Sequence, residues 1–305
     1  NLSENTLSAL TKFTPPIPPA PVTRIFFIFN YYNNLILLII NQLYLMEKQH
    51  IFLSHDVDWS FEGPSKEHIL KRKDRFDEKL FDTNPTNKLY RNFSEYMEIE
   101  EKYNVKSTFF FRTQYENGNY EDYEDDIKNL IKGNWEIGLH TDPSSIDDIN
   151  KIKKEKMNLE RIANTKIYGN RVHYLSNNKQ LPKKLSELDF VYDSSNKKNK
   201  YEITVNDMGF SQIDKIIEFP VTLMDAYLFS YMNISEEKII SIVKETLDMG
   251  RQLNSNFNII SILWHDNVLK MKGGRMYPKI LEFLSSQDDV IMHTGIELAK
   301  KIKCQ

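Results

Sequence analysis

The sequence has 305 residues, of which 40% are hydrophobic and 27% are charged, a balance typical of a globular protein rather than a disordered or fibrous one. Its 40 basic and 43 acidic side chains leave a net charge of -3, which argues against nucleic-acid binding driven by overall charge. The single cysteine, Cys304, excludes a disulfide framework, a cysteine zinc cluster and an iron–sulfur site within one chain. Any bound metal must therefore be held by histidine, aspartate or glutamate.

The first 46 residues differ in composition from the rest. Residues 1–24 contain the run PPIPPAP, which favours an extended chain, and residues 25–46 are apolar and long enough to span a bilayer about 30 Å thick. Asparagine and glutamine side chains interrupt this apolar stretch, and each amide is costly in hydrocarbon. It could be a membrane anchor or uncleaved signal, a surface helix, or a segment foreign to the folded protein. We favour the last interpretation.

The expected organisation is therefore a non-domain extension over 1–46 and one catalytic domain over 47–305. We expect this domain in the cytoplasm, with membrane association or export only if residues 25–46 are a real anchor.

From residue 47 onward, short apolar runs alternate with amphipathic charged segments. The apolar runs predict strands at 50–55, 107–112, 135–140, 166–170, 190–193, 216–221, 258–264 and 290–293. The amphipathic segments predict helices at 87–103, 121–132, 146–163, 181–188, 235–253 and 277–286. This alternation indicates an α/β protein with one parallel sheet, closed or nearly closed into a (β/α) barrel. No glycine-rich phosphate loop follows a strand, so a nucleotide-binding protein is not indicated.

Ionisable residues gather at the predicted carboxyl ends of these strands. They are Asp56 and Asp58 after the first strand, His140 after the third, Arg171 and His173 after the fourth, Asp193 after the fifth, and His265 and Asp266 after the seventh. Barrel enzymes carry their active sites at this end. A strand-end aspartate alone is commonly a helix cap, and a lone histidine is commonly solvated, but the joint pattern favours a catalytic site.

The segment SHDVDW at 54–59 is the most informative. Asp56 and Asp58 are two residues apart, so they share one face if the strand continues. Two neighbouring carboxylates repel, and a metal would relieve this if one carboxylate ligates while the other accepts a proton from water. His55 points to the opposite face, which indicates a residue that packs, or that supports the ligands from behind, rather than a metal ligand.

Seven short motifs occur in order along residues 50–300. They are SHDVDW at 54–59, STFFFRTQ at 107–114, EIGLHT at 136–141, GNRVHY at 169–174, FVYDSS at 190–195, FPVTLMD at 219–225 and ILWHDN at 262–267. Together they resemble the polysaccharide deacetylase family, carbohydrate esterase family 4, with its NodB-type homology domain. The form of the motifs is closest to the WbmS-like O-antigen-cluster branch.

The resemblance implies a distorted (β/α) barrel of about seven parallel strands with its active site at the carboxyl ends. It implies a hydrolase that removes acetyl or similar acyl groups from N-acetylated sugars of a polysaccharide or its precursor. It also implies a divalent metal cofactor, zinc first, with Co, Mn, Ni or Fe as alternatives. We therefore expect a carbohydrate substrate and no nucleic-acid partner.

The resemblance also implies roles for matching residues. These are a catalytic base at Asp56, metal ligands at Asp58 and His140, an arginine that holds the base at Arg171, and a catalytic acid at His265. The family's second metal histidine would stand at position 144, where this chain has Ser144. Asp142 and His173 are candidate replacements. We favour His173, because two imidazoles and one carboxylate leave an open position for water, although a substrate-binding role for His173 stays open.

Further candidates surround this set. Asp266 or Asp193 could hold His265 in the required tautomer. Candidate substrate-binding residues are Tyr174, Trp264, Trp59 and Asp193.

Two other functions remain open: a carbohydrate-binding barrel with impaired catalysis, and an unrelated metal-dependent phosphodiesterase. The phosphodiesterase requires a basic pocket, for which the sequence offers only Arg112, Arg171 and Arg275 near the proposed site.

Overall fold

A computed structural model describes residues 48–81, 87–253 and 257–304. The predicted extension over 1–46 lies outside these residues, so its anchor, signal and foreign-segment interpretations stay predictions. One compact unit spans Lys48–Gln305. None of the helices in the described part of the chain combines the length and apolar character that crossing a bilayer requires.

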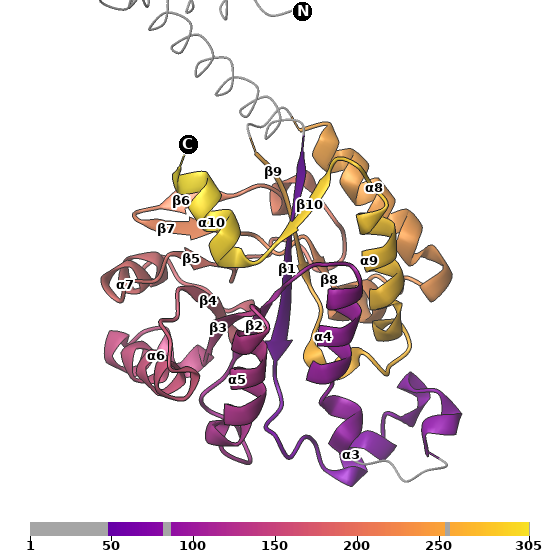
Figure 1. The fold of residues 1–305 in the computed structure, drawn as a ribbon, viewed down its shortest axis with the longest axis horizontal. Helices are drawn as coiled ribbons and strands as arrows, with labels where there is room; N and C mark the ends of the chain where they lie inside the picture. Colours follow the sequence, from indigo (N-terminus) through magenta and orange to yellow (C-terminus); the bar gives the residue numbers. More distant parts are fainter. Residues whose placement is uncertain (1–47, 82–86, 254–256, 305) are drawn as a thin grey trace, which may run out of the picture. The chain divides into compact units, whose positions relative to one another are not determined.

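A single, mostly parallel sheet runs through the described residues (Figure 1). Its strands are β1 (Gln49–Val57), β2 (Thr108–Phe111), β3 (Glu136–Thr141), β4 (Gly169–Val172), β5 (Tyr192–Asp193), β6 (Ser211–Ile213), β7 (Ile216–Glu218), β8 (Leu223–Met224), β9 (Asn258–Leu263) and β10 (Val290–His293). Their order is β6-β7-β5-β4-β3-β2-β1-β9-β8. The first half of β1 pairs with β10 and its second half with β2, so these two strands share one edge of β1.

The strands β7 and β8 are two halves of one interrupted strand. β7 pairs with β5, β8 pairs with β9, and only residues 219–222 separate them. Within this gap, Val221 N donates to Asn196 O at 2.8 Å and Thr222 N donates to Ser261 O at 3.0 Å. Pro220, which lacks an N–H, lies at the break. The sheet thus curls through seven positions, namely β1 to β5, the split strand and β9, and the expected distorted barrel is confirmed.

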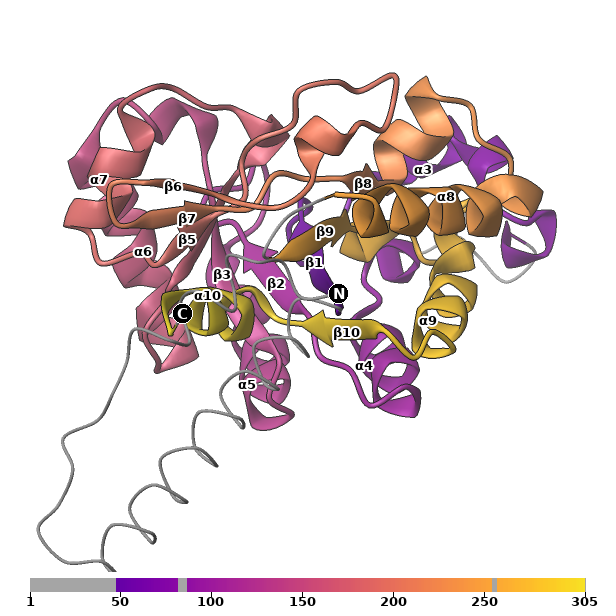
Figure 2. The ribbon, with the colours of Figure 1, turned by 90° about the horizontal axis from the view of Figure 1, so that it is seen from above.

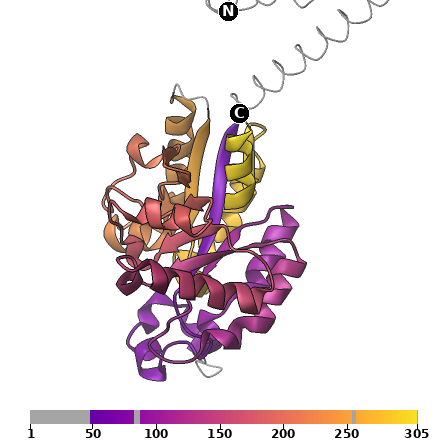
Figure 3. The same cartoon turned by 90° about the vertical axis from the view of Figure 1, so that its left-hand side faces the viewer.

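Helices cover the outer face of this sheet (Figure 2). They are α4 (Phe93–Lys102), α5 (Glu124–Lys132), α6 (Ile149–Ala163), α7 (Leu181–Glu187), α8 (Ile239–Arg251) and α9 (Tyr277–Ser285). Two further helices, α3 (Lys66–Leu70) and α10 (Gly295–Lys303), lie at opposite ends of the sheet (Figure 1). Strand side chains alternate between the helix layer and the barrel interior. On β1, Leu53 and Val57 pack in the helix-facing core, whereas Phe52 packs in the interior cluster. β1 itself runs through the middle of the molecule (Figure 3).

The amino-terminal end of the barrel is closed by α10. Leu298 and Ala299 pack against the interior cluster around Phe52 and Phe110. The helix start is held where β2 and β3 begin, because Glu136 accepts from Ile296 N at 2.9 Å. Packing is tight here: a Cβ on Gly138 would lie 2.5 Å from the Phe110 ring. With this end filled, the opposite end is where polar side chains of the interior face can meet.

The eight predicted strands are all found, and each predicted helix overlaps an observed one. Three differences have physical causes. β4 begins three residues later than the predicted start at 166, which places Arg171 within the strand. β6 was not predicted, because three residues carry no readable periodicity. β8 lies beyond the strand predicted at 216–221, although within the motif FPVTLMD, which resembles a later strand of the family. The helix α10 was also not predicted, although Thr294 and Glu297 form its capping box.

Candidate active site

The last residues of β1 bring two carboxylates to one end of the barrel. Phe52, Ser54 and Asp56 share the interior face, and Asp58 follows immediately after the strand. Asp56 is buried, whereas the Asp58 side chain is 25% exposed. The strand period of two therefore explains how one carboxylate is enclosed while the next lies at the mouth of the site.

Three side chains from three elements converge on one point. Asp58 Oδ1 lies 3.2 Å from His140 Nε2 and 3.2 Å from His173 Nδ1, and these two nitrogens are 3.1 Å apart. His140 Nδ1 lies 3.0 Å from Arg171 O, and a carbonyl can only accept, so the proton of the neutral ring is on Nδ1. His140 Nε2 therefore presents a lone pair to the other two atoms.

Asp58 Oδ1, His140 Nε2 and His173 Nδ1 thus form a triangle of donor atoms, which we call the donor triangle. A cation would stabilise this arrangement. Electron pairs that face one another at such distances repel unless a proton or a metal lies between them. Asp58, His140 and His173 form one of the described groups able to hold a metal ion, and two imidazoles with one carboxylate suit zinc. Asp56, Asp58 and His265 form a second such group that shares Asp58.

The turn after β4 aims His173 into the site. Tyr174 and Leu175 have φ values of 61° and 52°, a left-handed conformation that is strained for residues with a Cβ. The His173 ring lies 3.8 Å from the Tyr174 ring, centroid to centroid. His173 is buried and Tyr174 is 77% exposed, so the tyrosine ring contacts His173 and also faces solvent.

Asp56 is held by Arg171. Arg171 Nη1 donates to Asp56 Oδ1 at 2.8 Å and to Ser54 Oγ at 2.9 Å, and Nε donates to Ser194 O at 2.9 Å. The guanidinium also lies 4.4 Å from the centroid of the Phe110 ring. Burial alone would raise the pKa of Asp56, but the nearby positive charges, that of Arg171 first, together lower it below its usual value. Asp56 is therefore an ionised carboxylate that can accept a proton.

His265 lies on the other side of Asp58, with Nε2 at 3.5 Å from Asp58 Oδ2. Its Nδ1 contacts Asp225 Oδ1 at 2.7 Å, and its backbone N donates to Asp225 Oδ2 at 2.9 Å. Burial alone would lower the pKa of His265, but the carboxylates of Asp225 and Asp58 raise it to about 10. The imidazole can therefore carry a proton at Nε2 at neutral pH.

The prediction that Asp266 or Asp193 orients His265 is wrong, because Asp225 occupies that position. Asp193 is buried and instead contacts Asn170 and Ser195. Asp266 is buried as well, and burial followed by the charge of Asp58 raises its pKa well above the usual value.

The aromatic candidates separate into surface and core. Trp264 is 1% exposed, and its Nε1 donates to Gly274 O, so the expected sugar contact is contradicted. Asp193, also 1% exposed, offers no surface to a substrate either. Trp59 packs edge-on against His68 and Tyr90 in a small core beside the barrel. Tyr174 alone keeps a large exposed face.

Asp142, the alternative to His173 as the replacement ligand, lies outside the donor triangle. Asp142 Oδ1 accepts from Ser144 Oγ at 2.7 Å, and Asp142 Oδ2 accepts from Arg112 Nη2 at 3.3 Å. Arg112, considered from the sequence only for a phosphodiesterase, has no role in the predicted hydrolase site. Its Nη1 donates to Asp58 O at 3.2 Å, and it is 5% exposed. Asp225 is the second site residue that the sequence did not predict. Its position directly after an apolar run was the one feature of the sequence that could have indicated it.

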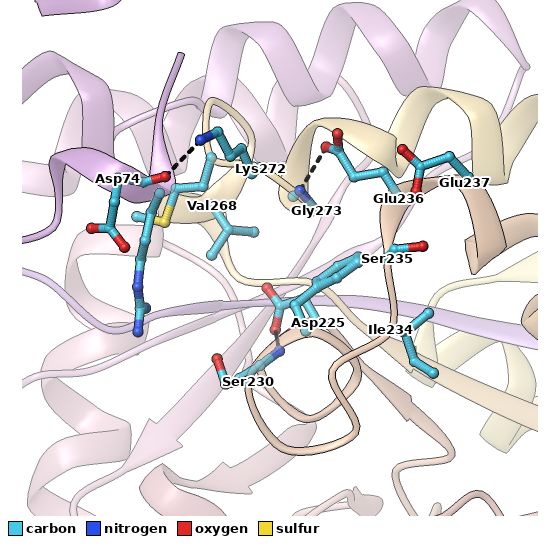
Figure 4. Close-up of a pocket in the computed structure, with 15 residues that line it drawn as sticks. Asp74, Asp225, Ser230, Ile234, Ser235, Glu236, Glu237, Val268, Lys272 and Gly273 are labelled. Atoms are coloured by element: carbon cyan, nitrogen blue, oxygen red, sulfur yellow. Dashed lines mark hydrogen bonds between the residues drawn. The ribbon is translucent and has the colours of Figure 1, made fainter. Parts of the chain in front are cut away.

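A cavity of ≈ 560 Å³ opens beside Asp225 (Figure 4). Phe229, Val268 and Met271 contribute to its apolar lining. Two hydrogen bonds tie its rim, from Lys272 Nζ to Asp74 O at 2.8 Å and from Gly273 N to Glu236 Oε1 at 2.7 Å. The donor triangle does not contribute to this lining, whereas Asp225, the partner of His265, does.

No protein-family model and no curated protein matches the sequence. Solved structures do match. A structure described as a polysaccharide deacetylase from Mycobacterium smegmatis has a TM-score of 0.62 at 17% identity, over 85% of this chain and 92% of that one. One from Pseudomonas aeruginosa PAO1 has a TM-score of 0.60 at 12% identity, over 85% and 92%. Puue allantoinase has a TM-score of 0.59 at 12% identity, also over 85% and 92%.

At these identities the comparisons establish the fold, and an allantoinase beside two deacetylases shows that the fold does not fix the substrate. The WbmS-like branch stays a prediction. The chain has the curled α/β barrel fold of the polysaccharide deacetylases.

Proposed function

We propose that this protein is a metal-dependent hydrolase that removes an N-acetyl or similar acyl group from a sugar of a polysaccharide or its precursor. The observation that carries the proposal is the donor triangle of Asp58, His140 and His173, flanked by Asp56 and His265. A divalent cation held by this triangle, with zinc favoured, would polarise the acyl carbonyl and lower the pKa of water.

The flanking side chains divide the proton transfers between them. Asp56, kept ionised by Arg171, accepts a proton from the water whose oxygen attacks the acyl carbon. His265 donates the proton on Nε2 to the sugar nitrogen as the carbon–nitrogen bond breaks. The products are a carboxylate and a free amine. Asp225 fixes the tautomer of His265 from the far side.

The test is metal analysis of the purified chain together with release of acetate from chitotetraose. The parent is expected to contain about one metal ion per chain, because the structure offers three converging donors to one ion. Asp58→Ala, His140→Ala and His173→Ala are each expected to lose the metal and acetate release together. Ser144→Ala is the matched control, because Ser144 binds Asp142 rather than the donor triangle.

A metal-free parent that releases no acetate would overturn the proposal in favour of a barrel with impaired catalysis. Retention of the metal in His173→Ala, with loss only in the other two variants, would assign His173 to substrate binding.

A further inference from the structure

The chain that carries the proposed acid leaves the sheet just before His265. β9 ends at Leu263, and one residue further on Trp264 N donates to Ser54 O at 2.9 Å. The carbonyls of Trp264, His265 and Asp266 lie beyond the paired positions of the sheet, and all three residues are buried. A buried carbonyl needs a hydrogen-bond partner, so donors from outside the sheet must supply it here.

One face of α4 is directed at these carbonyls. Asn92, Tyr96 and Glu100 stand four residues apart, a spacing that places them on one side of a helix, and all three are 0% exposed. Tyr96 Oη donates to His265 O at 2.8 Å. Asn92 Nδ2 donates to Asp266 O at 2.9 Å. One step along this face of the helix therefore corresponds to one residue along the segment.

The third position of this face acts through His55. The Nδ1 of His55 lies 2.6 Å from Trp264 O, and its Nε2 lies 2.8 Å from Glu100 Oε1. Since a carbonyl can only accept, Nδ1 carries the proton that faces Trp264. Three successive positions of one helix face thus hold three successive carbonyls, those of residues 266, 265 and 264.

Asn92 shows that this arrangement serves the segment rather than the helix. It occupies the N-cap position of α4, where an asparagine side chain commonly accepts a hydrogen bond from the first turn. Its side chain makes no such bond and instead donates to Asp266 O and, at 3.3 Å, to Leu89 O. Its Oδ1 is buried and has no hydrogen-bond partner among the described residues. The side chain therefore forgoes a helix cap and leaves an acceptor unsatisfied while it holds the segment.

The contact from Tyr96 supports His265 from the side opposite Asp225. Asp225 holds the ring at Nδ1 and the backbone at N, whereas Tyr96 holds the backbone at O from the helix-facing core. Both peptide groups that flank the acid are thereby fixed. Misplacement of a catalytic group by about 1 Å can cost about 10²-fold in rate, so this support bears on catalysis.

We propose that α4 positions His265 for proton transfer, with Tyr96 and Asn92 as positioning residues that act on the backbone of the acid and its neighbour. The inference rests on the proposed function for the role of His265. Its consequence is selective, because a sugar amine leaves only as it gains a proton, whereas a nitrophenolate leaves without one. A loosened His265 should therefore slow cleavage of an amide far more than cleavage of an activated ester.

The test compares acetate release from chitotetraose with hydrolysis of 4-nitrophenyl acetate. Tyr96→Phe should lower kcat for chitotetraose about 10- to 100-fold, with KM and metal content unchanged, and should keep the ester rate within about twofold. Asn92→Ala should act in the same direction, and it removes no helix cap. Equal losses on both substrates, or no loss on either, would overturn the inference.

Tyr192→Phe is the matched control. Tyr192 is also 0% exposed, and its hydroxyl donates to Glu136 Oε1 at 2.9 Å, at the amino-terminal end of the barrel. This variant loses a buried hydroxyl of the same kind without touching the segment of His265. It should therefore keep the ratio of the two rates.

Amide hydrogen exchange at His265 N separates this inference from the proposed function. This N–H donates to Asp225, so its exchange measures how firmly the segment is held even in a protein that cleaves neither substrate. Tyr96→Phe should speed the exchange at least about fivefold relative to Tyr192→Phe, as expected for one lost buried hydrogen bond. Unchanged exchange would overturn the inference whatever the activity. Faster exchange, in a chain whose parent releases no acetate, would support the positioning of His265 and overturn the hydrolase.

Discussion

The carboxylate of Asp225 holds His265 at two points, one oxygen on Nδ1 at 2.7 Å and the other on the backbone N at 2.9 Å. These two contacts fix the orientation of the imidazole ring and the position of the His265 backbone. Since Nδ1 faces Asp225, Nε2 is the nitrogen directed toward Asp58 and the reacting group. Asp225 is therefore a positioning residue for the proposed acid.

Asp225→Asn should lower kcat by about 10²- to 10⁴-fold, the range typical of general acid catalysis, because the variant loses the charge that keeps His265 protonated. Metal content should be unchanged, since Asp225 lies outside the donor triangle. Acetate release and metal analysis measure the two effects. Asp266→Asn is the control: the raised pKa of Asp266 favours its neutral form, which an amide resembles. Equal losses in both variants would contradict the assignment.

Arg171→Lys should move the acidic limb of the profile of kcat/KM against pH to higher pH. Burial raises the pKa of Asp56 and Arg171 opposes it with a charge-assisted bond at 2.8 Å. A lysine cannot reproduce the hydrogen bonds to Ser54 and Ser194, so its charge is held less firmly beside Asp56. The pKa of Asp56 then rises, and the carboxylate takes up its proton at higher pH. We expect a shift of about one unit. An unchanged limb, with kcat alone lowered, would show that Arg171 acts on something other than Asp56.

Much of the site was predictable, because barrel enzymes place their active sites at the carboxyl ends of the strands. Asp56, His140 and His265 each follow an apolar run long enough to read as a strand, and parallel strands bring such residues to one edge. The closeness of His173 to Asp58 could not be read from spacing, because it depends on the left-handed turn at Tyr174 and Leu175. Without that turn, nothing in the sequence distinguishes a ligand from a solvated histidine.

Burial was harder to predict than position. Trp264 and His265 are adjacent, yet strand alternation sends the indole into the helix-facing core and the imidazole into the site. No role was predicted for Asp225, because β8, the strand before it, is only two residues long and reaches β9 only after the break that separates it from β7. In both cases the outcome depends on how the barrel closes, which local sequence does not encode.

His293 should make the fold less stable in mild acid. Burial, and then the neighbouring His50, lower its pKa to about 3, whereas an unfolded histidine has a pKa of about 6.5. Between these values the unfolded chain binds the extra proton, so this contribution to stability is complete above pH 6.5 and decreases as the pH falls. From pH 6.5 to 5 the loss is about 2 kcal/mol. Urea unfolding at pH 7 and 5 measures it, and His293→Gln should reduce the difference; an equal difference in both proteins would contradict this prediction.

Glu100 should be essential for stability although it lies outside the active site. Its carboxylate accepts from Trp135 Nε1 at 2.6 Å, from Tyr277 Oη at 2.7 Å and from His55 Nε2 at 2.8 Å. His55 Nδ1 faces Trp264 O at 2.6 Å, so both ring nitrogens of His55 face oxygen atoms. This pair is fully buried on the helix side of β1, in agreement with the packing role predicted for His55.

Glu100→Ala removes the shared partner of three buried side chains, those of His55, Trp135 and Tyr277, so the free energy of unfolding should fall by about 3–5 kcal/mol. Glu101→Ala is the control, because Glu101 is exposed and its contact with Lys106 at 3.3 Å contributes at most about 1 kcal/mol. Urea unfolding at pH 7 measures both. Because His55 lies between Ser54 and Asp56, which contact Arg171, the same variant should also lower metal content. A destabilised variant that keeps its metal would show that the two faces of β1 act independently.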